Sequence, residues 1–173
     1  MSEVVVGFPQ PLIRHIVPNK FSQPLQQLIL SGLEGDWYPP VEVTGKQISW
    51  YVKAVRDSNP MHVLSATRKA IAPGGLVAGM LPSLVPLYKE ITGLDRTVTE
   101  VSASHETLKL VFEKDRLCAR VKVTQCYQDL NTQRVIIIIE YEIATCNTGQ
   151  IPTHVLKGRR VLSLRFRDIH TDS

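Results

Sequence analysis

The segment RDSNPMH, residues 56–62, places a carboxylate and an imidazole close together after a helix-like apolar run. A carboxylate and an imidazole that reach the same bound water can act together as general base and general acid. Between them, Asn59 and Pro60 limit the freedom of the backbone, since proline fixes its own φ and restricts the residue before it. Asp57 and His62 are therefore predicted to point into one cavity and to form an acid–base pair.

A helix is predicted directly before this segment. Thr44 is a suitable N-cap, apolar residues recur after it at helical spacing, and the pattern stops before Pro60. The apolar positions are Ile48, Tyr51, Val52 and Val55. Residues 33–43, in front of this helix, have the composition of a turn that enters a short strand. The acid and the histidine are thus expected to follow the C-terminus of a helix.

A second helix is predicted for residues 74–93, which are apolar on nearly all sides up to Tyr88. This pattern is typical of a helix that is buried inside a wrapped sheet. Pro82 and Pro86 each remove a backbone hydrogen bond and clash with the preceding turn. The helix is therefore expected to begin late, to bend, or both.

From about residue 97 the pattern changes to long segments rich in valine and isoleucine, which are separated by turn signals. The predicted strands are residues 97–112, 116–128, 134–145 and 154–166. Neighbouring strands joined by short turns form an antiparallel meander, and a long sheet after one buried helix defines the α+β class. Residues 134–145 alternate only after their middle, so the centre of this strand is expected to be covered on both faces.

The composition is that of a single globular domain, with 173 residues, 43% of them hydrophobic and 21% charged. The net charge of +4 is not concentrated in a dense run of lysine and arginine, which argues against nucleic-acid binding. The sequence has neither an apolar run long enough to span a membrane nor the pattern of a signal peptide. A soluble, cytoplasmic protein is expected, with no nucleic-acid or membrane partner.

The N-terminal region and the cysteines give weaker signals. Residues 1–27 are rich in proline and show little periodicity, so they are predicted to form an arm, either extended and packed on the domain or partly ordered, before one domain at 28–173. The three cysteines, Cys118, Cys126 and Cys146, have no CxxC spacing and no histidine at ligand spacing. They are predicted to be reduced thiols, with no metal site and no disulfide framework.

The segment DSNPMH resembles the DxNPxH signature of the MaoC-like hydratases, a group with the hot-dog fold that includes the (R)-specific enoyl-thioester hydratases. The resemblance covers roughly residues 33–167. LVAGML is similar to the family's I-x-H-G-M-L at the start of the central helix, and EKDRLCARVKV is similar to its PGDTLxxxVxV strand. The resemblance implies a single hot-dog domain, in which an antiparallel sheet wraps around a central helix.

The same resemblance implies an activity and its residues. The expected enzyme is a hydro-lyase without a cofactor, an (R)-specific 2-enoyl-thioester hydratase or the reverse 3-hydroxyacyl dehydratase. Asp57 and His62 would be the catalytic pair, Asn59 would support them, and the amide of Gly79 would hold the negative charge on the thioester oxygen. The sequence departs from the family at Ala78, where the family has a histidine.

Substrate contacts and partners are also implied. Leu81 and Leu84 are expected to line the acyl tunnel. Arg159 and Arg160 either contact the phosphates of coenzyme A or an acidic acyl carrier protein, or belong to the solvated face or edge of a strand. The family implies a homodimer.

Two other functions stay open. One is thioester hydrolysis, which hot-dog proteins also perform with a carboxylate that activates water. The other is a non-catalytic subunit that binds acyl groups or stabilises a heterodimer, for which Ala78 and the two prolines of the second helix are the motivating features. In that case Asp57 is a turn residue whose side chain satisfies the local backbone.

Overall fold

The structure, a computed structural model, describes residues 13–15, 21–63, 68–93, 97–146 and 151–165. Its helices are α1 (Gln23–Ser31), α2 (Gly45–Val55), the 3-10 turn η1 (Pro60–His62), α3 (Gly74–Gly79), α4 (Leu81–Leu84) and α5 (Pro86–Gly93). Its strands are β1 (Ile13–His15), β2 (Val41–Glu42), β3 (Ile71–Ala72), β4 (Thr97–Thr107), β5 (Val111–Phe112), β6 (Arg116–Asp129), β7 (Arg134–Thr145) and β8 (Thr153–Arg165).

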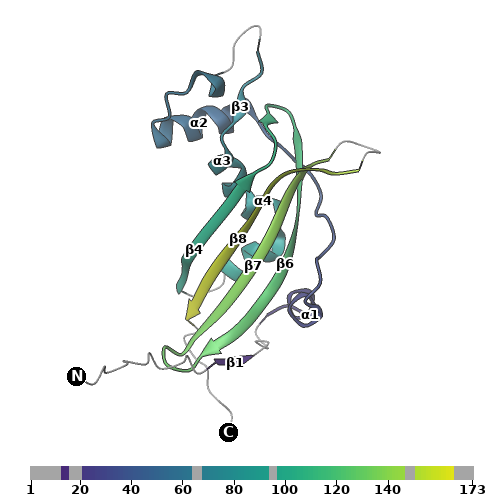
Figure 1. Cartoon of the computed structure of the whole chain (residues 1–173), viewed down its shortest axis with the longest axis vertical. Helices are drawn as coiled ribbons and strands as arrows, with labels where there is room; N and C mark the ends of the chain where they lie inside the picture. The colour runs from purple at the N-terminus through teal and green to yellow at the C-terminus, as the bar shows by residue number, and fades with distance from the viewer. Residues whose placement is uncertain (1–12, 16–20, 64–67, 94–96, 147–150, 166–173) are drawn as a thin grey trace, which may run out of the picture.

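The main sheet has the strand order β1-β6-β7-β8-β4, and β2 also pairs with β6. Figure 1 shows β4, β8, β7 and β6 side by side. β6, β7 and β8 form the predicted antiparallel meander. The prediction is wrong for β4, which pairs with β8 at the far edge instead of with the next strand along the chain. The reason is the segment between β4 and β6, where β5 leaves the main sheet and pairs with β3.

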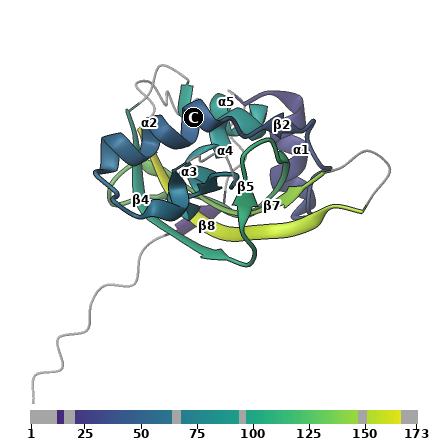
Figure 2. The same cartoon turned by 90° about the horizontal axis from the view of Figure 1, so that it is seen from above.

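The sheet is curled around short helices. Its pairing register shifts between Glu100 and Ser102, between Val123 and Gln125, and between Ile143 and Ala144. Such irregularities bend strands and increase their twist. Seen from above, the helices lie on one side of β7 and β8 (Figure 2). This arrangement confirms the predicted α+β hot-dog fold.

The predicted helix over residues 74–93 is divided into three pieces. It begins at Gly74, so the late start is not observed, whereas the expected bend is confirmed by the breaks between α3, α4 and α5. Pro82 lies in the first turn of α4, and Pro86 is the first residue of α5. Each proline thus occupies a position where its missing N–H has no partner to lose within the helix.

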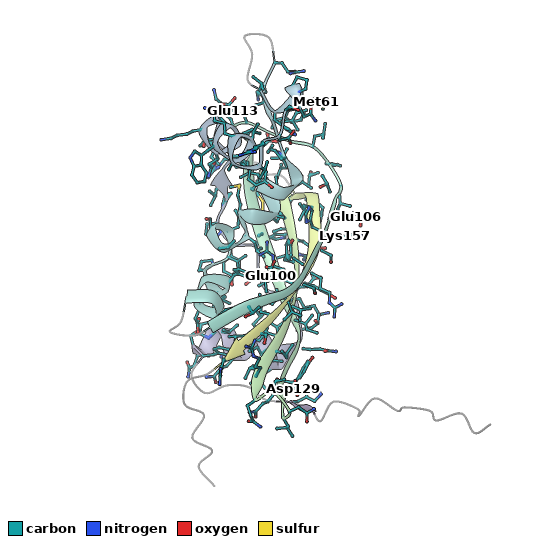
Figure 3. All side chains as sticks on the ribbon, turned by 90° about the vertical axis from the view of Figure 1, so that its left-hand side faces the viewer. Met61, Glu100, Glu106, Glu113, Asp129 and Lys157 are labelled. Atoms are coloured by element: carbon teal, nitrogen blue, oxygen red, sulfur yellow. A yellow bond between two sulfur atoms is a disulfide. The ribbon has the colours of Figure 1, made fainter. Side chains whose placement is uncertain are left out.

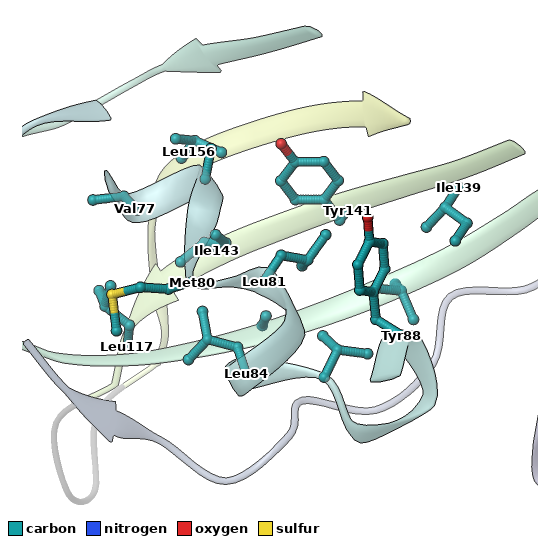
Figure 4. Close-up of a cluster of buried hydrophobic side chains, with 14 of the residues drawn as sticks. Val77, Met80, Leu81, Leu84, Tyr88, Leu117, Ile139, Tyr141, Ile143 and Leu156 are labelled. Carbon is teal, nitrogen blue, oxygen red and sulfur yellow. The ribbon is translucent and has the colours of Figure 1, made fainter. Parts of the chain in front are cut away.

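The core lies between the concave face of the sheet and the helices, as Figure 4 shows. The middle of β7 is covered on both faces as predicted, since Ile137, Ile138 and Ile139 are 0%, 6% and 1% exposed. The largest fully buried side chains come from α1, α2, α4, α5 and the long strands, and they are Leu25, Ile48, Leu81, Leu84, Ile91, Leu117, Ile137, Ile139, Ile143, Leu156, Leu162 and Leu164.

Helix α1 corrects part of the prediction for the N-terminal arm. Residues 23–27 are helical instead of extended, and Leu25 is completely buried in the core. The carboxylate of Glu90 accepts hydrogen bonds from the N–H and the hydroxyl of Ser22, each at 2.7 Å, at the N-terminus of α1. The start of the helix is thereby joined to α5. Residues 1–12 and 16–20 of the predicted arm lie outside the described residues.

The prediction of three reduced cysteines is wrong for two of them. Cys118 pairs with Ala144 across β6 and β7, which brings the Cα atom of Cys146 to 6.0 Å from that of Cys118, and the two cysteines form a disulfide bond. Pairing of distant segments decides this contact, which the spacing along the chain does not reveal. Cys126 is a free, buried thiol, and burial raises its pKa from 9.0 to about 12.

Candidate active site

Helix α2 positions Asp57, the predicted acid. The helix starts with a capping box, in which Oγ1 of Thr44 accepts from the N–H of Gln47 and Oε1 of Gln47 accepts from the N–H of Thr44. It ends at Val55, and the C-cap residue Arg56 has a left-handed φ of 56°. Directly after this turn, the N–H of Asp57 donates to the carbonyl oxygen of Val52 at 2.9 Å. The C-terminal turn of α2 thus fixes the position of the Asp57 backbone, from which the carboxylate extends.

The backbone between the acid and the histidine is held by its own side chains. Oδ1 of Asp57 accepts from the N–H of Asn59 at 2.9 Å, and Oδ1 of Asn59 accepts from the N–H of Met61 at 3.0 Å. Pro60 opens η1, and the N–H of His62 donates to the carbonyl oxygen of Asn59. Asn59 therefore lies between the two predicted catalytic residues and holds the turn that carries the imidazole.

Asp57 and His62 face each other, as the sequence predicted. Oδ2 of Asp57 lies 3.4 Å from Nε2 of His62, and Nδ1 of His62 lies 2.6 Å from the carbonyl oxygen of Ile71. A carbonyl oxygen can only accept, so Nδ1 carries a proton, and Nε2 is the ring nitrogen that faces the carboxylate. When Nε2 carries no proton, it and the carboxylate are two acceptors that can hold one water molecule donating a hydrogen to each.

The pair opens into a pocket of about 370 Å³. Asp57 and His62 are partly exposed there, at 32% and 12% of their side chains. The other residues that line the pocket come mainly from η1, β3, α3 and the ends of β4, β5 and β8, and they are Asn59, Met61, Ile71, Ala72, Pro73, Gly74, Val77, Thr107, Lys109, Leu110, Val111, Val155 and Leu156. Sequence reasoning missed nearly all of them, because strand pairing and not spacing brings them together.

Gly79 is not where the resemblance placed it. It is the last residue of α3, so the expectation that its amide lies at the start of the central helix is wrong, and it does not line the pocket. Gly74 is the first residue of α3 and does line the pocket. A Cβ atom at Gly74 would lie 2.7 Å from Oγ1 of Thr107, so a glycine is needed for the helix to approach β4. The available signal was Pro-Gly-Gly at 73–75, which marks a break before a helix.

Leu81 and Leu84 do not line the pocket either. They are 0% and 1% exposed and pack in the hydrophobic core on α4 (Figure 4). The breaks in the 74–93 segment separate α4 from α3, whose residues Gly74 and Val77 do reach the pocket. The structure thus places the two leucines in the core and not in the pocket of Asp57 and His62.

Arg159 and Arg160 point to opposite faces of the sheet, as successive strand residues do. Arg159 lines a separate depression of about 420 Å³ with Lys157, and Lys157 forms an ion pair with Glu106 at 2.9 Å. Figure 3 shows Glu106 and Lys157 on the side of the sheet away from the helices. β8 lies between β7 and β4, so the alternative that this segment is a sheet edge is wrong. Neither arginine lines the pocket of Asp57.

The side chain of Arg160 points inward, where other groups of the protein accept hydrogen bonds from its two terminal nitrogens. Nη2 donates to the carbonyl oxygen of Ala78 at 2.9 Å, and Nη1 donates to Oε2 of Glu100 at 2.8 Å and to the hydroxyl of Tyr88 at 3.0 Å. Burial raises the pKa of Tyr88 although the Arg160 cation lowers it, so the phenol stays protonated. Arg160 thus joins α3, α5 and β4 to β8.

The described residues offer neither a cluster of metal ligands nor a helix that could span a membrane. In these parts of the chain, histidine, cysteine and carboxylate side chains do not gather into a group of three or more that could bind a metal ion. Within the same segments, the helices are too short or too polar to cross a lipid bilayer.

The fold is similar to that of solved hydratases and dehydratases. An (R)-hydratase from A. caviae involved in PHA biosynthesis has a TM-score of 0.57 at 20% identity, covering 75% of this chain and 95% of that one. A C-terminally truncated HadBC complex, a 3R-hydroxyacyl-ACP dehydratase from Mycobacterium tuberculosis, has a TM-score of 0.58 at 19% identity, covering 76% and 94%. A monoamine oxidase regulatory protein from Archaeoglobus fulgius has a TM-score of 0.58 at 20% identity, covering 79% and 89%.

Sequence comparison adds no relative to this set. Neither a protein-family model nor a curated protein matches the chain. At these identities the structural similarity shows the fold, which is the hot-dog fold of MaoC-like dehydratases and (R)-hydratases.

Proposed function

We propose that the chain is an (R)-specific 2-enoyl-thioester hydratase, or the reverse 3-hydroxyacyl-thioester dehydratase, that acts on acyl groups carried by coenzyme A or acyl carrier protein. The observation that carries this proposal is the pair formed by Asp57 Oδ2 and His62 Nε2, which face each other at 3.4 Å. The similarity in fold to an (R)-hydratase and a 3R-hydroxyacyl-ACP dehydratase supports the reaction class and its stereochemistry.

The roles follow from the proton on Nδ1 of His62. Since that proton is directed at Ile71, Nε2 and the carboxylate of Asp57 are both available to hold and deprotonate one water. The water oxygen bonds to the β-carbon, the double-bond electrons move toward the α-carbon and the thioester oxygen, and the proton taken from water is returned to the α-carbon. In the reverse direction the same two groups remove the α-proton and protonate the leaving hydroxyl.

The charge that develops on the thioester oxygen needs a donor. Gly74, the first residue of α3, lines the pocket together with His62, whereas Gly79 does not. Asn59 acts by holding η1, because its side chain accepts from the N–H of Met61.

The test is the loss of enoyl-thioester absorbance with 2-butenoyl-CoA. We expect turnover by the unaltered protein and a decrease of kcat by about 10²–10⁴-fold in Asp57→Asn and in His62→Ala. His154→Ala is the matched control, because His154 also faces a carboxylate, Glu142, at 3.5 Å but lies outside the pocket. The proposal fails if folded Asp57→Asn retains full turnover.

The alternative functions have separate readouts. Release of free thiol from the same thioester, without loss of a double bond, would indicate hydrolysis. If neither reaction occurs with coenzyme A thioesters, carrier-protein thioesters are the next substrates. Tight acyl-CoA binding without any turnover, unchanged in Asp57→Asn, would favour the non-catalytic subunit.

We also propose that two copies of the chain pair along β4. This strand pairs with β8 on one side, and among the described residues no strand pairs with its other side. Residues 99–107 are exposed along its length, including Val101 at 59%. An edge this long attracts another strand unless it is covered. Light scattering at micromolar concentration should give the mass of a dimer, and a strict monomer would contradict this proposal.

A further inference from the structure

The inner wall of the pocket is closed by apolar side chains. Val77 of α3, Val111 of β5 and Leu156 of β8 line the pocket and are 2%, 3% and 1% exposed. An acyl tail that extends inward from the Asp57–His62 pair would meet this wall, because apolar surface is where a hydrocarbon tail binds.

The space behind the wall is occupied by the core. Figure 4 shows Leu156 beside Val77, with Ile143 and Leu81 continuing the packing toward Tyr141. Ile143 and Leu81 are completely buried. Protein cores are packed as densely as organic crystals, so a longer tail could enter only by displacing these side chains.

A polar group also lies farther along the same strand. The inward-facing positions of β8 after Leu156 are Gly158 and Arg160. Tyr141 covers Gly158, since a Cβ atom there would contact the hydroxyl of Tyr141, and Arg160 donates to Ala78 and Glu100. A tail that followed β8 past Leu156 would therefore meet the phenol of Tyr141 and then the hydrogen-bonded guanidinium of Arg160. Contact with the methylene groups of the tail would not compensate for the cost of burying these polar groups against it.

The pocket is correspondingly small. Its volume of about 370 Å³ lies near the lower end of the range of about 300–1,000 Å³ for small-molecule sites. This space has to hold the reacting water, the thioester and the end of its carrier arm in addition to the acyl tail. Little of it remains for methylene groups.

We infer that the pocket selects short acyl groups, of about four carbons, and that Leu156 and Val77 set this limit. The inference rests on the proposed function and names its substrate class. It assigns a length-limiting role to Leu156 and Val77, whereas the sequence led us to expect Leu81 and Leu84 as the lining of the acyl tunnel.

The first experiment compares 2-butenoyl-, 2-hexenoyl- and 2-octenoyl-CoA as substrates. We expect kcat/KM to fall by at least about tenfold from the four-carbon to the eight-carbon substrate, because methylenes that do not fit are rejected by this order of magnitude. Equal or better use of 2-octenoyl-CoA would overturn the length limit and leave the hydratase proposal intact.

The second experiment shortens the side chains that form the inner wall of the pocket. Leu156→Ala should raise the ratio of eight-carbon to four-carbon kcat/KM by about tenfold or more. Leu164→Ala is the matched control, because Leu164 is equally buried on the same face of β8 but does not line the pocket. Val77→Ala removes less volume and serves if Leu156→Ala does not fold. An unchanged ratio in both pocket variants would overturn the roles of the two residues.

Binding separates a failure of this inference from a failure of the proposed function. Calorimetry with the saturated butyryl-CoA and octanoyl-CoA measures the length limit without any reaction. Weaker binding of octanoyl-CoA, together with no turnover of any enoyl thioester, would reject the hydratase proposal and keep the short pocket. Tighter binding of octanoyl-CoA would reject the short pocket.

Discussion

The two ends of the hot-dog domain differ in what holds them in place. At the pocket end, Asp57 and Asn59 each accept a hydrogen bond from the backbone N–H two residues further on, and Met61, which lines the pocket, is 40% exposed. In the interior, Leu81 is completely buried between α4 and the sheet. Figure 3 shows this long axis, with Met61 near one end and Asp129 near the other. The side chains proposed to react thus contribute little to the core, so stability and activity should respond to different substitutions.

The largest effect on stability is expected in the interior. Leu81→Ala should lower the free energy of unfolding by about 2–5 kcal/mol, because it removes buried methyl groups and leaves a cavity. Leu30→Ala removes the same atoms from a side chain that is 71% exposed and should change stability by less than about 0.5 kcal/mol. Urea unfolding of both variants measures the difference. Equal losses would mean that burial does not distinguish the two positions.

Arg160 should have the next largest effect. Arg160→Lys keeps the charge but loses the planar group that reaches Ala78, Tyr88 and Glu100, which should lower stability by about 1–3 kcal/mol. The neighbouring Arg159 faces solvent on the other side of β8, so Arg159→Lys should change stability by less than about 0.5 kcal/mol. Thermal unfolding compares the pair. The network has no special role if both lysine variants melt at the same temperature.

Substitutions of Asn59 test whether a change at the pocket end affects activity more than stability. Asn59→Ala removes the acceptor of the Met61 N–H and should reduce stability by about 1 kcal/mol or less, while kcat falls by about tenfold as the imidazole loses its position. Asn59→Asp keeps an acceptor oxygen and should recover part of kcat. Steady-state kinetics and urea unfolding measured on the same samples separate the two effects. A large loss of stability with kcat unchanged would place Asn59 among the structural residues.

The smallest effect is expected at the end of α2. Arg56 adopts a left-handed φ of 56°, which side chains with a Cβ atom disfavour, so Arg56→Gly should raise stability by up to about 1 kcal/mol. The same change at Lys53, inside the helix, should lower stability by about 1 kcal/mol. Opposite shifts of the urea midpoint support this explanation, and a loss of stability in both variants contradicts it.

Local patterns predicted the elements well. The capping residue Thr44, the helical spacing after it and the valine- and isoleucine-rich strands all match the structure closely, because these signals depend on residues within a turn or a strand of each other. The Asp57–His62 pair belongs to the same class, since one short turn brings both side chains together. Their chemical roles stay a proposal.

Contacts between distant segments could not be predicted in this way. The pairing of β4 with β8, the disulfide between Cys118 and Cys146, and the start of the central helix at Gly74 instead of Gly79 all depend on which segments meet across the fold. A strand pattern shows that a segment is extended but not which neighbour it pairs with.

The sequence by itself therefore determined helix α2, the long strands and the turn that carries the acid and the histidine. Only the tertiary structure decided that the Ile71 carbonyl fixes the proton on His62 and that Leu156 closes the pocket while Leu81 fills the core. The physical reason is the distance along the chain over which each kind of interaction acts. Backbone conformation follows from steric and hydrogen-bonding preferences of near neighbours, whereas a pocket is formed by side chains that only long-range packing brings together.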